Sequence, residues 1–188
     1  MKPGIGRRAL LASLGLALAA GPARAQTPQK LFDWYSLANA AAENKTDDVA
    51  IFLRKGENPN FLDPSGRSPL DYAASFGNTA MIKLLLNAGA RVDYRDKDGA
   101  TALHWAAEAG QAEAIAALVQ ANAPVDAINR QGITPLMLAA GANKGEAVKA
   151  LLKAGADPKR QDFTGRDARS FAAGHANALR ALEAATPG

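Results

Sequence analysis

The chain has 188 residues, 22 of them basic and 18 acidic, and a formal net charge of +4. It contains no cysteine, which excludes disulfide bonds and cysteine chemistry. Its two histidines stand apart from any carboxylate pair, so a zinc site is not indicated.

Residues 1–25 have the pattern of a secretory signal peptide. The segment 1–8 is basic and has no acidic residue, 9–20 is an apolar run, and a small-x-small cleavage site at 23–25 precedes Gln26. The run is too short for a membrane-spanning helix. The abundance of small residues indicates a bacterial periplasmic protein without stable membrane insertion after cleavage. An uncleaved anchor is the alternative.

The export signal also accounts for the basic charge. Residues 7–11, Arg-Arg-Ala-Leu-Leu, resemble a twin-arginine signal, and an ordinary Sec signal with two arginines is the alternative. Cleavage would remove Lys2, Arg7, Arg8 and Arg24, which leaves 18 basic and 18 acidic residues. A mature chain near neutrality gives no indication of a nucleic acid partner.

An aromatic cluster at 31–35 stands between the signal and the first repeat. Its simplest interpretation is a cover for the hydrophobic flank of the first repeat, and a partner-docking patch is the alternative.

Most of the remaining chain repeats with a period of 33 residues. The period relates four glycines, Gly66, Gly99, Gly132 and Gly165. It also relates apolar residues further on, such as Leu85, Leu118 and Leu151. Such a period indicates one supersecondary unit stacked on copies of itself. We expect five repeats, the outer two being atypical caps, at approximately 30–62, 63–95, 96–128, 129–161 and 162–185.

Each repeat carries the same local signals. Thr or Ser can cap the first helix, and Pro69 and Pro135 suit its first turn. A left-handed turn between two helices is predicted at Gly77, Gly110 and Asn143. A hairpin turn is predicted to begin at each of Asp63, Asp96, Asn129 and Asp162.

Two segments carry the signature of a known family. Residues 101–107 read Thr-Ala-Leu-His-Trp-Ala-Ala and 134–140 read Thr-Pro-Leu-Met-Leu-Ala-Ala, while 85–90 and 151–156 each close with Leu-Leu-x-Ala-Gly-Ala. The pattern resembles the ankyrin repeat from about Leu31 to Ala185. The resemblance implies one domain at 26–188, an all-α repeat solenoid of helix-turn-helix units joined by β-hairpin loops.

Catalytic chemistry is not indicated. His104 occupies the histidine position of the ankyrin signature, where the resemblance implies that its ring hydrogen-bonds backbone between repeats. His175 lies in the last repeat and is interpreted as a surface residue. The glycines are spaced by the repeat and form no phosphate loop. We therefore expect no enzyme, no cofactor and no metal.

The resemblance implies that a partner protein docks in a concave groove formed by hairpin tips and first helices. Aromatic and arginine side chains, which dominate binding hot spots, recur there. The candidate protein-binding residues are Arg67, Phe76, Tyr94, Arg95, Lys97, Arg130, Ile133, Phe163 and Arg166. The inward-facing Tyr72, Trp105 and Phe171 are assigned to the core, and Arg169 is expected to face water in the terminal cap.

The sequence thus predicts a monomeric periplasmic scaffold or adaptor that binds another protein. Bacterial proteins similar to it have been associated with catalase, which implies a link to peroxide defence. An inhibitor or immunity-type modulator of a partner enzyme is the alternative, and a hydrolase is the third.

Overall fold

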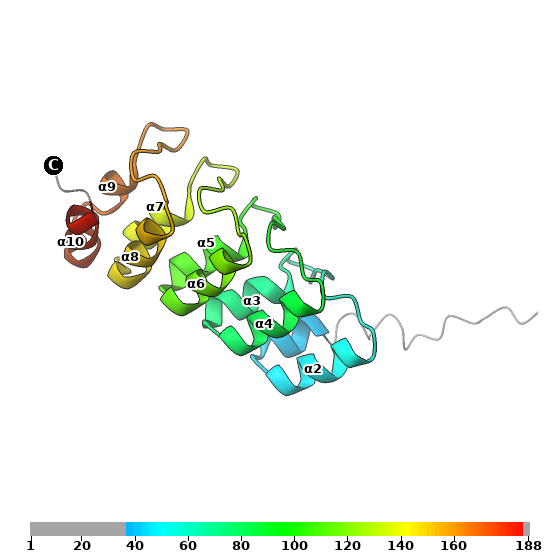
Figure 1. Cartoon of the computed structure of the whole chain (residues 1–188). Coiled ribbons are helices and arrows are strands. Elements are labelled where there is room, and N and C mark those ends of the chain that lie inside the picture. Colours follow the sequence, from blue (N-terminus) through cyan, green and yellow to red (C-terminus); the bar gives the residue numbers. More distant parts are fainter. Residues whose placement is uncertain (1–36, 186–188) are drawn as a thin grey trace, which may run out of the picture.

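The computed structural model describes residues 37–185, and there the helices form five successive pairs (Figure 1). The predicted signal peptide and the aromatic cluster at 31–35 lie outside the described residues. The pairs are 37–42 with α2 (Thr46–Arg54), α3 (Pro69–Phe76) with α4 (Thr79–Asn87), α5 (Ala102–Ala109) with α6 (Ala112–Gln120), α7 (Pro135–Gly141) with α8 (Gly145–Lys153), and α9 (Ala168–Phe171) with α10 (Ala176–Ala185).

The pairs stack in two layers. First helices contact one another in the order α3, α5, α7, α9, and second helices in the order α2, α4, α6, α8, α10. The hairpin loops project together from one side of the stack (Figure 1). The predicted all-α repeat solenoid is therefore confirmed, and each described helix pair falls within its predicted repeat.

The helix ends follow the local signals. The Ser68 hydroxyl accepts a hydrogen bond from the backbone N–H of Asp71 at 3.2 Å, and Thr134 caps α7 in the same way. Gly77 and Gly110 adopt φ values of 71° and 84°, and Asn143 adopts 57°. The left-handed turns predicted between the helices are confirmed, because only glycine or asparagine tolerates this region readily.

The hairpins are closed by backbone and side-chain hydrogen bonds together. In each, the backbone N–H of the first residue donates to the carbonyl oxygen four residues later, as Asp63 does to Arg67 at 2.9 Å. The first residue of each accepts a hydrogen bond, through its side-chain oxygen, from the backbone N–H four residues later. These bonds are Arg67 N to Asp63 at 2.9 Å, Ala100 N to Asp96 at 2.8 Å, Ile133 N to Asn129 at 3.0 Å and Arg166 N to Asp162 at 2.9 Å. No residue of these described loops belongs to a regular strand, so the β-hairpin loops that the resemblance implied are closed turns without a strand ladder.

The core lies between successive pairs. Leu85, Leu118 and Leu151, one from each central second helix, are fully buried. At the C-terminal end Arg169 is exposed and pairs with Glu183 at 3.1 Å, which confirms that this cap faces water.

We expect Leu118→Ala to lower the free energy of unfolding by about 2–5 kcal/mol, because it leaves a cavity between two repeats. The exposed Lys83→Ala on α4 should change it by less than about 0.5 kcal/mol. Urea unfolding followed by circular dichroism measures both. Equal, small effects would contradict a core continuous through α6.

Candidate functional site

The side of the stack that carries the hairpins and first helices is called the groove face. Its shape depends on one column of the repeat, the position that follows each repeating glycine. Arg67, Ala100, Ile133 and Arg166 each follow a repeating glycine. In the first of these positions the guanidinium carbon of Arg67 lies 4.2 Å from the ring centroid of Tyr72 and 3.8 Å from that of Trp105. The cation is therefore stacked between α3 and α5.

The two rings are anchored at the groove face. The Tyr72 hydroxyl donates to Asp63 at 2.5 Å, and the Trp105 indole N–H donates to Asp96 at 3.0 Å. Burial disfavours the charge of Asp63, but hydrogen bonds from Ser65, Tyr72 and the backbone outweigh it and lower the pKa of that carboxyl.

The prediction that Tyr72, Trp105 and Phe171 belong to the core is confirmed only in part, since all three are half-buried while Tyr72 and Phe171 pack against the core. Hydrogen bonds to the hairpin aspartates hold the first two rings at the groove face. Phe171 is covered by the guanidinium of Arg166, 4.6 Å from the ring centroid, and Arg166 is held in turn by Asp162 at 2.8 Å.

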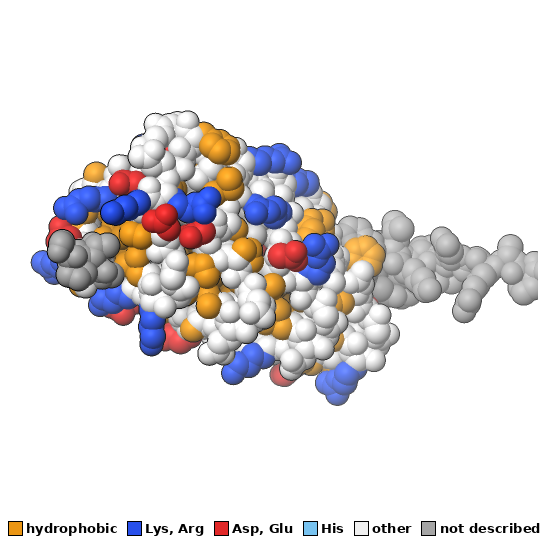
Figure 2. All heavy atoms as spheres, turned by 45° about the horizontal axis from the view of Figure 1, so that its top comes forward, with side chains coloured by type: hydrophobic (Ala, Val, Ile, Leu, Met, Phe, Trp, Pro, Cys, Tyr) orange, Lys and Arg blue, Asp and Glu red, His pale blue; other side chains and the backbone are white. Residues whose placement is uncertain are grey.

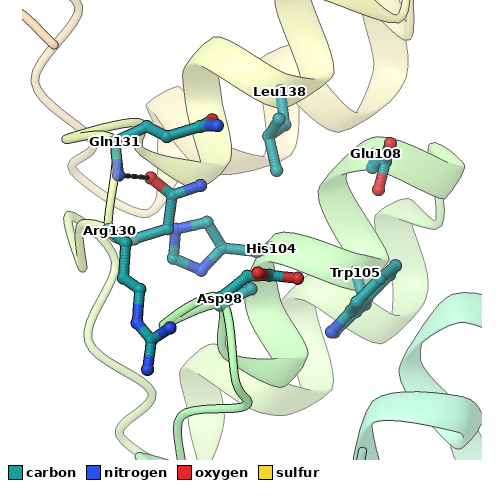
Figure 3. Close-up of a pocket in the computed structure, with 9 residues that line it drawn as sticks. Asp98, His104, Trp105, Glu108, Arg130, Gln131 and Leu138 are labelled. Atoms are coloured by element: carbon teal, nitrogen blue, oxygen red, sulfur yellow. Dashed lines mark hydrogen bonds between the residues drawn. The ribbon is translucent and has the colours of Figure 1, made fainter. Parts of the chain in front are cut away.

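A cavity of about 330 Å³ opens on the groove face between α5 and α7 (Figure 3). Trp105 and Leu138 line it from these two helices, and Ala100 lies where Arg67 and Arg166 carry long side chains. Asp98 and Arg130 line it from two neighbouring hairpins. Glu108, exposed near the end of α5, also lines it, as do Asn129 and Gln131.

His104 also lines this cavity, but both ring nitrogens are engaged. Nδ1 lies 3.1 Å from the Thr101 backbone N–H, and Nε2 lies 3.1 Å from the Ile133 carbonyl oxygen in the next repeat. Burial lowers the pKa of His104 to about 4, so the ring is neutral near pH 7. The interpretation of His104 as a link between repeats is confirmed.

The predicted binding residues divide into exposed and engaged groups. Phe76 is 45% exposed and Phe163 71% exposed, and Arg130 is exposed beside the cavity. In Figure 2, with the hairpin side turned toward the viewer, basic and acidic side chains lie beside apolar ones. Exposed aromatic and cationic side chains on one face are typical of a protein-binding surface.

The other candidates contact their own chain. The Arg95 guanidinium donates to the Gly99 carbonyl at 3.1 Å and to the Ile128 carbonyl, and the Lys97 ammonium donates to the Pro64 carbonyl. Ile133 is 7% exposed and belongs to the hydrophobic core, so it offers little surface.

Tyr94 is half-buried beside these hairpins. Arg67 and Arg166, stacked on rings, complete the engaged group.

Sequence reasoning did not select Asp98, Trp105, Glu108 or Leu138, which the structure gathers around one cavity. The available signal was the alanine at position 100, in a column that otherwise holds arginine and isoleucine.

Comparison with known families agrees with this geometry. A family model of ankyrin repeats, three copies long, matches residues 37–129 and 89–162. The chain belongs to the ankyrin-repeat family. No curated protein matches it. Ankyrin repeats generally mediate binding between proteins, which fits a groove face carrying exposed aromatic and basic side chains.

The described residues include no helix long and apolar enough to cross a membrane. Nor do they bring together three or more side chains of the kind that could hold a metal ion.

Two buried groups at equivalent repeat positions, Asp71 and His104, make the folding stability depend on pH in opposite directions. Burial raises the pKa of Asp71 to about 6, although its carboxylate accepts hydrogen bonds from the Ser68 N–H and hydroxyl. The folded chain holds this proton to a higher pH than the unfolded chain, so stability falls as pH rises from about 4 to about 6. For His104 the folded pKa is depressed, so stability rises between about pH 4 and 6.5.

We expect Asp71→Asn to remove the carboxyl group that makes stability fall as pH rises. The amide oxygen can still accept the hydrogen bond from the Ser68 N–H at the start of α3. Between pH 4 and 6 the variant's free energy of unfolding should rise more than that of the parent, by about 2–3 kcal/mol. Urea unfolding at a series of pH values measures this difference. Glu113→Gln, on the exposed side of α6, is the control. Parallel curves for parent and Asp71→Asn would show that the buried carboxyl does not titrate differently on folding.

Proposed function

We propose that this ankyrin-repeat protein is exported to the periplasm and binds another protein through its groove face, as an adaptor or stabiliser without turnover of its own. The observation that carries the proposal is the exposure of Phe76, Phe163 and Arg130 on that one face. Large exposed apolar side chains contribute little to folding, and together with an arginine on the same face they supply typical anchors for a partner.

The export part of the proposal rests on residues 1–25. We expect the mature chain to begin at Gln26, because the small-x-small site ends at Ala25. Mass measurement of the chain recovered from the periplasm checks this. Replacement of Arg7 and Arg8 by lysine should stop export by a twin-arginine route and spare a Sec route. A full-length chain retained in the cytoplasm in all cases would contradict export.

An inhibitor or immunity-type modulator uses the same face, and it predicts a one-to-one complex in which the partner enzyme loses activity. A catalase is one candidate partner, through the resemblance to proteins of peroxide defence. A hydrolase built on His104 is disfavoured, since both ring nitrogens are hydrogen-bonded within the fold.

The groove face is tested by using the purified protein as bait in a periplasmic extract. Phe76→Ala with Arg130→Ala should remove most recovery of a specific partner, because both side chains are exposed on that face. The matched control replaces one apolar and one basic residue on second helices, Ile51→Ala on α2, where Ile51 is 43% exposed, with Lys83→Ala on α4.

We expect the control pair to recover the partner as the parent does. If the groove pair and the control pair recover it equally, and both are folded, the binding site lies elsewhere on the molecule.

A further inference from the structure

The cavity on the groove face results from one change in the column that follows the repeating glycine, where Ala100 stands in place of the arginine found one repeat earlier. In the preceding repeat, the space between Tyr72 and Trp105 is filled by the guanidinium of Arg67. One repeat later, the corresponding space between Trp105 and Leu138 is faced by Ala100, whose side chain ends at Cβ. The neighbouring space is therefore open, with a volume of about 330 Å³.

The walls of this cavity suit a cation. Trp105 supplies an indole, the aromatic group that binds cations best, and Arg67 already stacks on it from the repeat before. Asp98 and Glu108 supply two carboxylates, while Arg130 supplies one positive charge and His104 is neutral. The lining residues themselves thus carry two negative charges and one positive charge, and the guanidinium of Arg67 lies 3.8 Å from the Trp105 ring centroid beside them.

The placement of these groups supports the same conclusion. In Figure 3 the Arg130 guanidinium points along the hairpin, away from Glu108 and Leu138. The Asp98 carboxylate lies between Arg130 and Trp105 in this view. Glu108 lies on the Leu138 side of Trp105 in this view, and both carboxylates line the cavity together with the indole.

We propose that this cavity receives an arginine side chain of the bound protein, stacked beside Trp105 and paired with Glu108 or Asp98. The inference rests on the proposed function and names the chemistry of the partner at one point of the groove face. It extends a mode that the fold already uses once, between Tyr72 and Trp105.

Other side chains fit these walls less well. An apolar side chain would take water from two carboxylates without giving them a partner, and an acidic side chain would be repelled. Lysine carries the charge but lacks the planar group that stacks on an indole and donates to carboxylates through a fork of N–H groups.

The test is a nuclear magnetic resonance titration of the purified chain with N-acetylarginine methylamide, which follows the indole N–H of Trp105. The chain has two tryptophans, so a Trp34→Phe background leaves one indole signal. The citrulline analogue is the neutral isostere of the probe. We expect a saturable shift with the arginine probe and binding weaker by about threefold or more with citrulline, from the lost charge interactions.

Two variants localise the effect. Glu108→Gln should weaken the arginine probe by about twofold to fivefold, as expected for one exposed ion pair. Ala100→Arg should fill the cavity from within, as Arg67 does one repeat earlier, and abolish the saturable shift while the chain stays folded. Ala100→Ser is the matched control and should retain binding.

Equal binding of arginine and citrulline probes, or a saturable Trp105 shift that persists in folded Ala100→Arg, would overturn the inference. It can fail independently of the proposed function. Recovery of a partner that depends on Phe76 and Arg130, with no response to the arginine probe, would reject the arginine cavity alone. A saturable arginine response that Ala100→Arg abolishes would support the cavity even if Phe76→Ala with Arg130→Ala left partner recovery unchanged. That second result would show that Phe76 and Arg130 do not bind the partner.

Discussion

The groove face depends on a hydrogen bond that a backbone N–H in each of four hairpins donates to the side-chain oxygen of the residue four positions earlier. Asp63, Asp96, Asn129 and Asp162 all make it, at 2.8 to 3.0 Å. In two repeats the second carboxylate oxygen also accepts a hydrogen bond from a ring on the first helix. The bond therefore sets the hairpin against the helix, and the groove face takes its shape from that relation. The described loops have no regular strand, and the side-chain bond reinforces the backbone hydrogen bond that closes each hairpin.

Because the backbone repeats so closely, the surfaces of the repeats differ through their side chains. The column that follows the repeating glycine shows the range of these differences. Arg67 fills the space between two rings, Ala100 leaves a cavity, Ile133 joins the core and Arg166 lies over Phe171 on the surface. Departures from the repeat consensus therefore carry the information about binding, while agreement with the consensus concerns stability.

The sequence was sufficient for the architecture because its signals are local and recur. A period of 33, the helix caps and the left-handed positions at Gly77, Gly110 and Asn143 each depend on residues close together in the chain. Exposure at the groove face depends instead on residues one repeat away. Arg67 stacks on Trp105 of the next repeat as well as on Tyr72 of its own, and Lys97 donates to the Pro64 carbonyl in the preceding repeat.

The structure also separates the predicted binding residues that are exposed to a partner from those that are not. Phe76, Arg130 and Phe163 were chosen for residue type and position, and they are exposed as a binding role requires. Ile133 was chosen for its place in the column, but its side chain packs into the core. Trp105 was assigned to the core from its inward position, and its bond to Asp96 keeps it at the surface.

The hydrogen bonding of Arg67 gives a further reason why a cation would be better accommodated one repeat later. Its Nε and Nη2 atoms are buried and find no acceptor among the described residues, so stacking on two rings must offset the loss of hydration. The cavity at Ala100 offers the indole of Trp105 together with the carboxylates of Asp98 and Glu108. A guanidinium there can stack and donate at the same time, which is the arrangement that favours arginine over other side chains. The fold thus leaves two nitrogen atoms of its own Arg67 without acceptors, while the cavity at Ala100, which has carboxylates in its lining, is open to an arginine of a partner.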